Sequence, residues 1–341
     1  MTLSAGAGSD GVDGTEELTL ADLSESDVLA RIFPRLPSAR AELLGPGDDA
    51  ALVAAPDGRY VVTTDMMIHG PDFRLAWSSP TDLGWKAAAT NLSDVAAMGA
   101  HPTALLLAIA APPSTPVWVL EGIADGLREC CAVLAPDCGV VGGDLSASAV
   151  LTLAITAIGD LGGRAPVLRS GAQVGDVVAL SGRMGHAARG LNLLFTHAVD
   201  SDGVPNALLA AGVADEYPDL IAAQLRPKPP IADGPRAADA GATSMLDVSD
   251  GLAIDAGRIA RASGVGFDFT SAALGDSPEI SLNGGEDHAL LATFPPGTAL
   301  PGGFTRIGTV TADAGVISLD GSPHSQGGWD PYRGWDGAAA G

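Results

Sequence analysis

Hydrophobic and polar residues follow two periods along the chain, and these predict strands and helices in mixed order. Short apolar runs between turn residues predict strands over residues 50–54, 59–64, 102–111, 139–141, 150–158, 177–181, 244–248 and 290–294. Apolar residues at helical spacing predict helices over residues 24–33, 79–98, 116–134, 234–240 and 250–263. Because both element types alternate in both halves of the chain, the fold class is α/β or α+β.

Local signals support several of these boundaries. Ser24 is placed to cap the first predicted helix, with Asp27 three residues further on. Pro80 stands near the start of the helix over 79–98, and Gly99 is suited to end it. A glycine-rich turn region over 159–164 predicts a domain boundary near Asp160. We therefore expect a disordered tail (1–21), an N-terminal domain (22–160) and a C-terminal domain (161–341).

The excess of acidic residues argues against two classes of binding partner, because their own charge is negative. There are 41 acidic residues against 18 basic ones, which gives a formal net charge of −23. Such a surface repels nucleic acid and anionic membranes, and we expect neither as a partner. It also repels ATP, so phosphate binding requires cations held by carboxylates.

The number of cysteines and the first residues of the chain indicate the cellular compartment in which we expect the protein. The three cysteines, Cys130, Cys131 and Cys138, do not form a disulfide scaffold, and we expect them to be buried and reduced. Residues 1–14 lack the basic and apolar regions of a signal peptide. The most apolar stretch, 104–111, is too short to span a bilayer. We expect a cytoplasmic protein.

Acidic residues recur where the pattern predicts loops or element ends, positions from which side chains converge on a cleft. They are Asp48, Asp49, Asp65, Asp94, Asp144, Asp247 and Asp250. One such residue alone is best explained as a turn or a helix cap. Together they predict oxygen ligands for several Mg²⁺ ions, because each Mg²⁺ is usually held by one or two carboxylates plus substrate phosphates.

The common phosphate-binding motifs are absent from the sequence. It contains no GxxxxGK[ST] motif and no protein-kinase set of motifs, so neither kinase class is expected. Residues 182–185 follow a predicted strand and could bring backbone N–H groups to a phosphate. A plain strand-to-helix turn explains these residues equally well.

Six short motifs stand out along the chain: Gly47-Asp-Asp-Ala-Ala51, Thr63-Thr-Asp65, Asn91-Leu-Ser-Asp-Val-Ala-Ala-Met-Gly99, Gly142-Gly-Asp144, Asp247-Val-Ser-Asp-Gly-Leu252 and Gly284-Gly-Glu-Asp287. They occur in the order found in thiamine-monophosphate kinases, and from about residue 22 to residue 336 the chain resembles that family. The family belongs to the superfamily of aminoimidazole-ribonucleotide synthetase, selenophosphate synthetase and the hydrogenase-maturation dehydratase. The resemblance implies two α/β domains, a homodimer whose N-terminal strands build a shared barrel, and ATP bound with several Mg²⁺ ions.

The resemblance also implies roles for individual residues. Magnesium ligands are expected at Asp49, Thr63, Thr64, Asp65, Asp94, Asp144, Asp247 and Asp250. Contacts to ATP are expected at Gly143, Asp144, Arg169 and Ser249. The thiamine half of the substrate is expected to contact Glu286 and Trp335, the latter preferred to Trp329 because it lies nearer the end of the chain.

Two departures from the family pattern concern the acceptor. The family usually has a substrate-contacting histidine in Gly-x-His-Phe, and here Asp72 occupies that place, while His69 lies three positions earlier. Asp72 is therefore the expected substrate contact of this loop. In the last motif, His288 and Ala289 replace the usual Tyr-Glu.

The implied reaction transfers the γ-phosphoryl group of ATP to thiamine monophosphate and gives thiamine diphosphate. The second pKa of a phosphate monoester is about 6, so the attacking oxygen is already ionised at neutral pH and no general base is assigned. Two alternatives stay open at this point. One is another ATP-dependent enzyme of the superfamily, similar to aminoimidazole-ribonucleotide synthetase, and the other is a non-catalytic nucleotide-binding protein.

Overall fold

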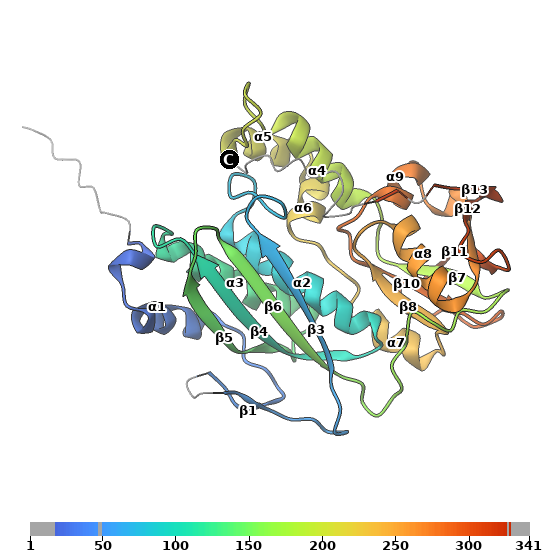
Figure 1. Cartoon of the computed structure of the whole chain (residues 1–341), viewed down its shortest axis with the longest axis horizontal. Coiled ribbons are helices and arrows are strands. Elements are labelled where there is room, and N and C mark those ends of the chain that lie inside the picture. The colour runs from blue at the N-terminus through green and yellow to red at the C-terminus, as the bar shows by residue number, and fades with distance from the viewer. Residues whose placement is uncertain (1–17, 47–49, 326, 329–341) are drawn as a thin grey trace, which may run out of the picture.

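The structure is a computed structural model that describes residues 18–46, 50–325 and 327–328. Two β-sheets with helices on and between them make up most of these residues (Figure 1). A short antiparallel pair, β1 (Glu42–Leu44) and β2 (Leu52–Val53), precedes the first sheet. The mixed α/β class expected from the sequence is confirmed.

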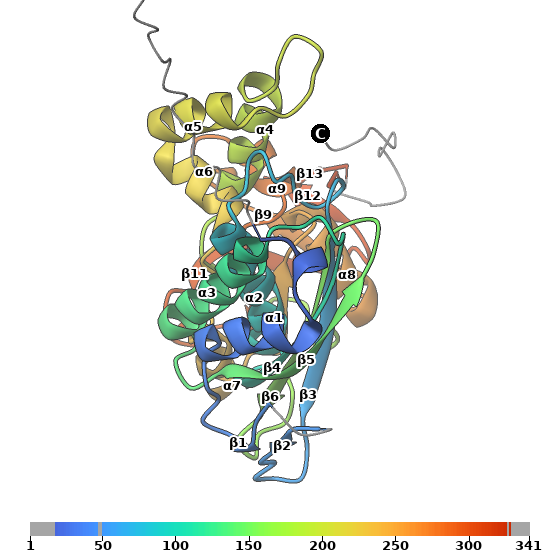
Figure 2. The same ribbon diagram turned by 90° about the vertical axis from the view of Figure 1, so that its left-hand side faces the viewer.

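The first sheet has four strands in the order β3-β6-β4-β5, and only β4 and β5 run parallel. Helices α2 and α3 cover one face of this sheet (Figure 2). Helix α1 and the 3-10 turn that follows it (Phe33–Arg35) are tied to α3 by ion pairs of 2.6 Å, from Arg31 to Glu121 and from Arg35 to Asp125. The bounds are α1 (Glu25–Ile32), β3 (Val61–Ile68), α2 (Pro80–Ala97), β4 (His101–Ala111), α3 (Val117–Leu134), β5 (Gly139–Ala147) and β6 (Thr152–Asp160).

The second sheet has seven strands in the order β13-β12-β9-β11-β7-β10-β8, antiparallel except for β12 and β9. Helices α4, α5 and α6 form a separate group, shown at the top of Figure 2. The bounds are β7 (Val177–Ser181), α4 (His186–His197), α5 (Ala207–Glu216), α6 (Pro218–Leu225), α7 (Asp233–Asp239), β8 (Ser244–Val248), α8 (Leu252–Ser263), β9 (Gly266–Phe269), α9 (Pro278–Asn283), β10 (Ala289–Phe294), β11 (Thr305–Thr311), β12 (Ile317–Leu319) and β13 (Ser322–Pro323).

Helix α2 packs against both sheets, since it contacts β3, β4 and β6 of the first and β8 and β10 of the second. Most of its residues are buried, as expected for a helix enclosed on nearly all sides. Ser79 caps its first turn by accepting a hydrogen bond from the Asp82 N–H, and Gly99 ends it with a φ of 76°. The helix therefore has one fixed position between the sheets.

Two glycines allow α2 and α3 to approach closely. A Cβ atom added at Gly84 of α2 would lie 2.0 Å from the carbonyl oxygen of Ile123 in α3. One added at Gly126 of α3 would lie 2.1 Å from the carbonyl oxygen of Thr81 in α2. Backbone therefore packs against backbone at this crossing, and neither position has room for a methyl group.

Strand and helix positions largely confirm the sequence predictions, with two errors that bear on the site. Asp65 was predicted at the end of a strand but lies in the middle of β3, and Asp144 was predicted in a loop but belongs to β5. In both cases the ladder hydrogen bonds continue past polar residues, which interrupt the apolar run but not the pairing.

The outer parts of the chain give three further observations. Leu20–Asp22 forms a 3-10 turn whose Leu20 N–H donates to the Thr115 carbonyl (3.0 Å), so ordered structure includes residues assigned to the predicted tail. All three cysteines are buried and unpaired, as expected. Among the described residues, no helix combines the length and apolarity needed to cross a bilayer.

Replacing Gly126 by Ala tests the close helix crossing. Alanine has the higher helix propensity, yet its methyl group would overlap backbone of α2, so we expect a loss of about 1–3 kcal/mol in unfolding free energy. Gly212 in α5 is the matched control, because a Cβ atom there meets nothing within 4 Å. Gly212→Ala should be neutral or stabilising by up to about 1 kcal/mol. Thermal melts compare the two, and equal stability of both variants would contradict the packing described.

Candidate active site

Strand β3 directs its odd-numbered side chains toward α2, and this brings two sequence-predicted residues to Asp94. The Thr63 hydroxyl donates a hydrogen bond to Asp94 Oδ2 (2.9 Å). The Asp65 N–H donates to Asn91 Oδ1 (3.1 Å), and the Asn91 side chain is fixed in turn by donating to the Ala87 carbonyl (2.9 Å). Side chains three residues apart on α2 thus hold the middle of β3.

The second sheet contributes Asp247, which lies on its edge strand β8 and is 6% exposed. Nδ1 of His288, which is also buried, lies 3.1 Å from Asp247 Oδ2. His288 directly precedes β10, and its carbonyl oxygen accepts a hydrogen bond from the Ser93 hydroxyl of α2 (3.4 Å). Its other ring nitrogen, Nε2, is buried and has no hydrogen-bond partner among the described residues.

Asp65, Asp94 and Asp247 form one electrostatic cluster. Burial, together with the charges of Asp247 and Asp65, raises the pKa of Asp94 to about 8. Partial removal from water and the charge of Asp247 also raise the pKa of Asp65. Burial would raise the pKa of Asp247 as well, but the contact with His288 outweighs it and lowers that pKa. Such a set of carboxylates binds hard divalent cations, whose charge removes the repulsion.

A second group of charged side chains lies at the other end of α2. The Lys86 ammonium forms an ion pair with Glu286 Oε2. Asp72 lies close by, since the charge of Glu286 acts with burial to raise its pKa, while Lys86 acts to lower it. Asp72 Oδ2 also accepts a hydrogen bond from the Ile68 N–H (2.7 Å). The structure therefore brings together Asp72 and Glu286, the two described residues that were predicted to contact substrate.

Asp250 and Ser249 follow β8 in a loop with its own supports. Asp250 forms an ion pair with Arg258, which also pairs with the fully buried Asp255. The Asp250 N–H donates to Asp255 Oδ2 (3.0 Å). The Ser249 carbonyl accepts a hydrogen bond from the Glu286 N–H (2.8 Å), which connects this loop to the second charged group.

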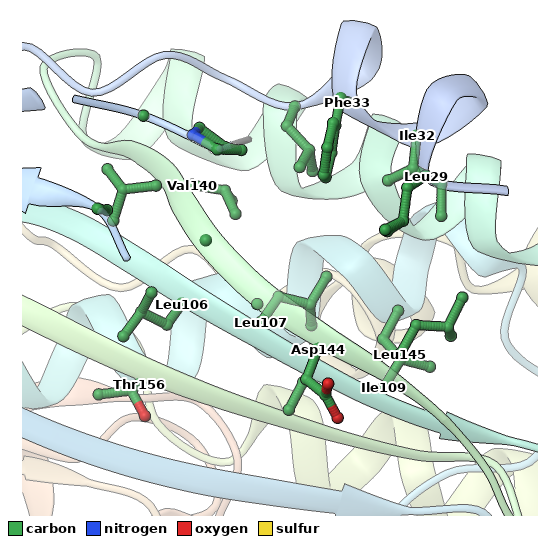
Figure 3. Close-up of a pocket in the computed structure, with 18 of the residues that line it drawn as sticks. Leu29, Ile32, Phe33, Leu106, Leu107, Ile109, Val140, Asp144, Leu145 and Thr156 are labelled. Atoms are coloured by element: carbon green, nitrogen blue, oxygen red, sulfur yellow. The ribbon is translucent and has the colours of Figure 1, made fainter. Parts of the chain in front are cut away.

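Thr64, Gly143 and Asp144 are not part of the cluster. Thr64 and Asp144 lie on the face of the sheet that points away from α2. Thr64 is paired with Thr156, Asp144 is paired with Ala108, and these two cross-strand rows are adjacent. Figure 3 shows Asp144 and Thr156 on this face, with residues of α1 opposite. A cavity of about 760 Å³, lined mainly by apolar side chains, lies along it. The predicted magnesium ligands on the first sheet thus fall on two faces, with Thr63 and Asp65 facing α2 and Thr64 and Asp144 facing away from it.

The remaining predicted residues stand apart. Arg169 lies in the connection between the two sheets, its side chain is exposed, and it makes no ion pair with any described residue. Asp49 and Trp335 lie outside the described residues, and so does the alternative Trp329. Their predicted roles rest on the sequence alone.

The turn at residues 182–185 leads into helix α4, and Asp287 caps that helix. Asp287 Oδ1 accepts a hydrogen bond from the Ala187 N–H (2.9 Å) in the first turn. Because a protein carboxylate already occupies this N-terminus, the structure favours the plain strand-to-helix turn over a phosphate site. Burial raises the pKa of Asp287 to about 6 even though backbone N–H groups act to lower it.

Three residues of the site were missed from the sequence: Lys86, Asn91 and His288. Asn91 was within a quoted motif, and its spacing of three residues from Asp94 places both on one side of a helix. Lys86 is one of only two lysines in the chain, a signal that could have drawn attention to it. His288 had been noted only as a departure from the family pattern.

Residues 47–161 match the family model for AIR synthase related protein, N-terminal domain. The fold resembles the solved structure of AaThiL complexed with AMPPCP and TMP, with a TM-score of 0.69 and 30% identity over 83% of this chain and 90% of that one. Thiamine-monophosphate kinase from Stenotrophomonas maltophilia K279a gives a TM-score of 0.70 and 33% identity over 88% and 96%.

Sequence comparison identifies the family. Thiamine-monophosphate kinase from Mycobacterium tuberculosis is 41% identical over 94% of this chain and 93% of its own length. The chain belongs to the thiamine-monophosphate kinase family. The resemblance inferred from the six motifs is confirmed.

Proposed function

We propose that this protein phosphorylates thiamine monophosphate with ATP and so forms thiamine diphosphate and ADP. The observation that carries the proposal is its likeness, over nearly the whole chain, to enzymes named for this activity, one of them solved with AMPPCP and TMP. The clustered carboxylates supply the chemistry that such a reaction needs, since ATP and the acceptor are both polyanions. The compartment expected from the sequence, the cytoplasm, suits these substrates.

Magnesium is the cation that fits the carboxylate cluster. Asp65, Asp94 and Asp247 offer hard oxygen atoms, whose charges raise the pKa of Asp65 and Asp94, and Thr63 adds a hydroxyl group beside them. Among the described residues, no three acidic, histidine or cysteine side chains are gathered closely enough to enclose an ion. This arrangement suits Mg²⁺, which keeps several waters and shares phosphate oxygens. When bound, Mg²⁺ neutralises phosphate charge.

We assign the remaining predicted ligands to the same role. Asp49, Thr64, Asp144 and Asp250 complete the set proposed to hold Mg²⁺ together with ATP. Asp250 is already paired with Arg258, so its carboxylate is held in place by the helix that follows, α8. Gly143, Arg169 and Ser249 are proposed ATP contacts. Arg169 is suited to this role because its exposed guanidinium can donate two parallel hydrogen bonds to a phosphate.

The protein residues act in this reaction by placing the reactants. The attacking phosphate oxygen of the acceptor is ionised near neutral pH, because the second pKa is about 6, and it needs no general base. Asn91 and Ala87 fix the middle of β3, and His288 fixes Asp247, so the acidic groups are held before substrate arrives. Catalysis then rests on orientation and on charges fixed in advance.

The thiamine half of the acceptor is proposed to bind beside Asp72 and Glu286, with Trp335 as a stacking partner. Thiamine carries a positively charged thiazolium ring, which two nearby carboxylates attract. An indole ring also attracts a cation to its face. In this division of the chain, residues 22–160 bind ATP and Mg²⁺, while residues 161–341 complete the substrate site.

A homodimer is proposed through the outward face of the first sheet. Val62 and Met66 on this face are 65% and 59% exposed, and the 760 Å³ cavity runs along it. Exposed apolar area of this kind usually marks an interaction surface. A second copy placing the same face against it would build the shared barrel that the family pattern implies and would cover Thr64 and Asp144.

The activity is tested by incubating purified protein with ATP, Mg²⁺ and thiamine monophosphate. We expect thiamine diphosphate, quantified by chromatography, and we expect chelation of Mg²⁺ to abolish its formation. Binding of ATP without any product would support the non-catalytic alternative. Product formation that survives chelation would contradict the role given to the carboxylates.

Replacing Asp94 by Asn tests the cation site. The variant keeps an acceptor for the Thr63 hydroxyl but loses the charge, so we expect kcat to fall at least about tenfold. It should also lose most of the rise in Tm that Mg²⁺ with ATP gives the wild type, because stabilisation by a ligand follows its affinity for the folded state. Asp313→Asn, an exposed change on a turn, is the control and should keep that rise. A full Mg²⁺-dependent rise in Asp94→Asn would remove Asp94 from the ligand set.

Replacing Leu106 by Glu tests the dimer. Leu106 lies on the outward face of the central strand β4 and lines the cavity, so a buried charge there would oppose association. We expect the variant to sediment as a monomer at micromolar concentration, while wild type sediments as a dimer. Val133→Glu on the solvent side of α3, where Val133 is 63% exposed, should leave the dimer intact. Identical sedimentation of Leu106→Glu and wild type would place the interface elsewhere.

A further inference from the structure

Lys86 is a buried ammonium group that neither the cation cluster nor the nucleotide contacts explain. It lies on α2 and is 6% exposed. A lysine is almost never buried unless its charge is paired, because removing an ammonium group from water is costly. Its environment therefore has to supply partners, and those partners indicate what the residue does.

The partners of Lys86 come from two segments far away in the sequence. Its ammonium forms an ion pair with Glu286 Oε2 in the loop before β10. Gln224 of α6, with its amide nitrogen donating to the Ala187 carbonyl (3.0 Å), accepts a second hydrogen bond from Lys86 Nζ at 3.1 Å. Neighbouring contacts hold the same junction, since Trp85 Nε1 donates to the Pro227 carbonyl (2.7 Å). The first turns of α2 thus fix both α6 and the Glu286 loop.

Glu286 is held in a conformation that its residue type disfavours. Its φ is 72°, in the left-handed region that favours glycine, and its N–H donates to the Ser249 carbonyl (2.8 Å). The preceding Gly285 has no room for a side chain, because an added Cβ would lie 2.3 Å from that same carbonyl. A strained residue of this kind persists only where surrounding contacts determine it, and such residues cluster at functional sites.

Lys86 and Glu286, the two members of the ion pair, differ in their exposure to solvent, and this difference separates their roles. The Glu286 side chain is 41% exposed, whereas that of Lys86 is 8% exposed. Lys86 is therefore enclosed while part of the Glu286 carboxylate stays open to a ligand. A change at Lys86 reaches a ligand through Glu286.

The local charge suits a singly charged cation. Asp72 and Glu286 carry two negative charges, and Lys86 offsets one of them. The remaining groups facing Lys86 are His288, which directly precedes β10, and the neutral amide of Gln224. One of the two carboxylate charges is therefore left without a lysine partner beside the open Glu286 side chain. Without Lys86, the two carboxylates would repel each other and Glu286 would turn toward water.

We propose that Lys86 is a positioning residue for the acceptor, which holds the Glu286 carboxylate toward the cationic thiazolium ring of thiamine monophosphate. The inference rests on the proposed function and adds a residue to its acceptor site. It predicts that Lys86 governs acceptor binding and has little influence on ATP.

Steady-state kinetics of Lys86→Met test the proposal. We expect KM for thiamine monophosphate to rise about tenfold or more, as when the support of a binding group is removed, while KM for ATP stays within about twofold. Lys228→Met is the matched control, because Lys228 is the other lysine of the chain and is exposed. It should change neither constant.

A double variant distinguishes positioning from general damage. If Lys86 acts through Glu286, adding Lys86→Met to Glu286→Gln should raise KM for thiamine monophosphate by less than about twofold, since coupled residues are not additive. A full additional tenfold rise would overturn the proposal. An equal rise in KM for ATP and for thiamine monophosphate in Lys86→Met would also overturn it.

Two further measurements keep the test decisive. If Lys86→Met does not fold, as judged by its Tm, Glu286→Gln breaks the same ion pair from the more exposed partner and must show the same selective rise in KM. If Glu286→Gln lacks this selective rise in KM for thiamine monophosphate, the proposal fails. If wild type forms no thiamine diphosphate at all, the proposed function fails first. Calorimetric binding of thiamine monophosphate to wild type and Lys86→Met then decides the inference by itself: weaker binding by the variant supports it, and equal binding overturns it.

Discussion

Repulsion among Asp65, Asp94 and Asp247 is the constraint on which the site depends. The charge of Asp247 raises the pKa of both Asp65 and Asp94, and Asp65 adds to the rise at Asp94, so the rest of the fold must hold these groups together. Each is held by a different element: Asp65 by a strand paired along its length, Asp94 by a buried helix and Asp247 by a buried strand. The unfavourable charge arrangement is stable because three independent packing interactions impose it.

Helix α2 is the element that sets the positions of these three carboxylates relative to one another. It contacts strands of both sheets, and its close crossing with α3 depends on glycines that leave no space for adjustment. Asn91 and Asp94 on this helix bind β3, while Ser93 bonds to the backbone at His288. A shift of α2 would therefore disturb the contacts of both sheets together. A larger residue in place of a glycine at the crossing with α3 would force such a shift.

The sequence predicted the elements well wherever apolar periodicity and cap residues agreed. Strands β7 and β8 were predicted with the bounds that the structure has. The first helix begins after Ser24, as its predicted cap indicated, and the helix with Pro80 near its start begins at that residue. Asp65 and Asp144 were misplaced because a polar side chain in a strand ends the apolar run without ending the ladder. The contact between Lys86 and Glu286 and the contact between His288 and Asp247 could not be predicted, because each joins two residues that are far apart in the sequence.

The spacing of charged groups along α2 connects the two ends of the proposed site. Lys86 and Asp94 are eight residues apart, which on an α-helix corresponds to about 12 Å along the axis. The end at Asp94 gathers carboxylates with no lysine or arginine in contact among the described residues, so only added cations can make it accept phosphates. The end at Lys86 has its own internal cation and leaves one negative charge open, which suits an organic cation. One rigid helix therefore fixes the separation between the proposed site for phosphate groups and the proposed site for the thiazolium ring.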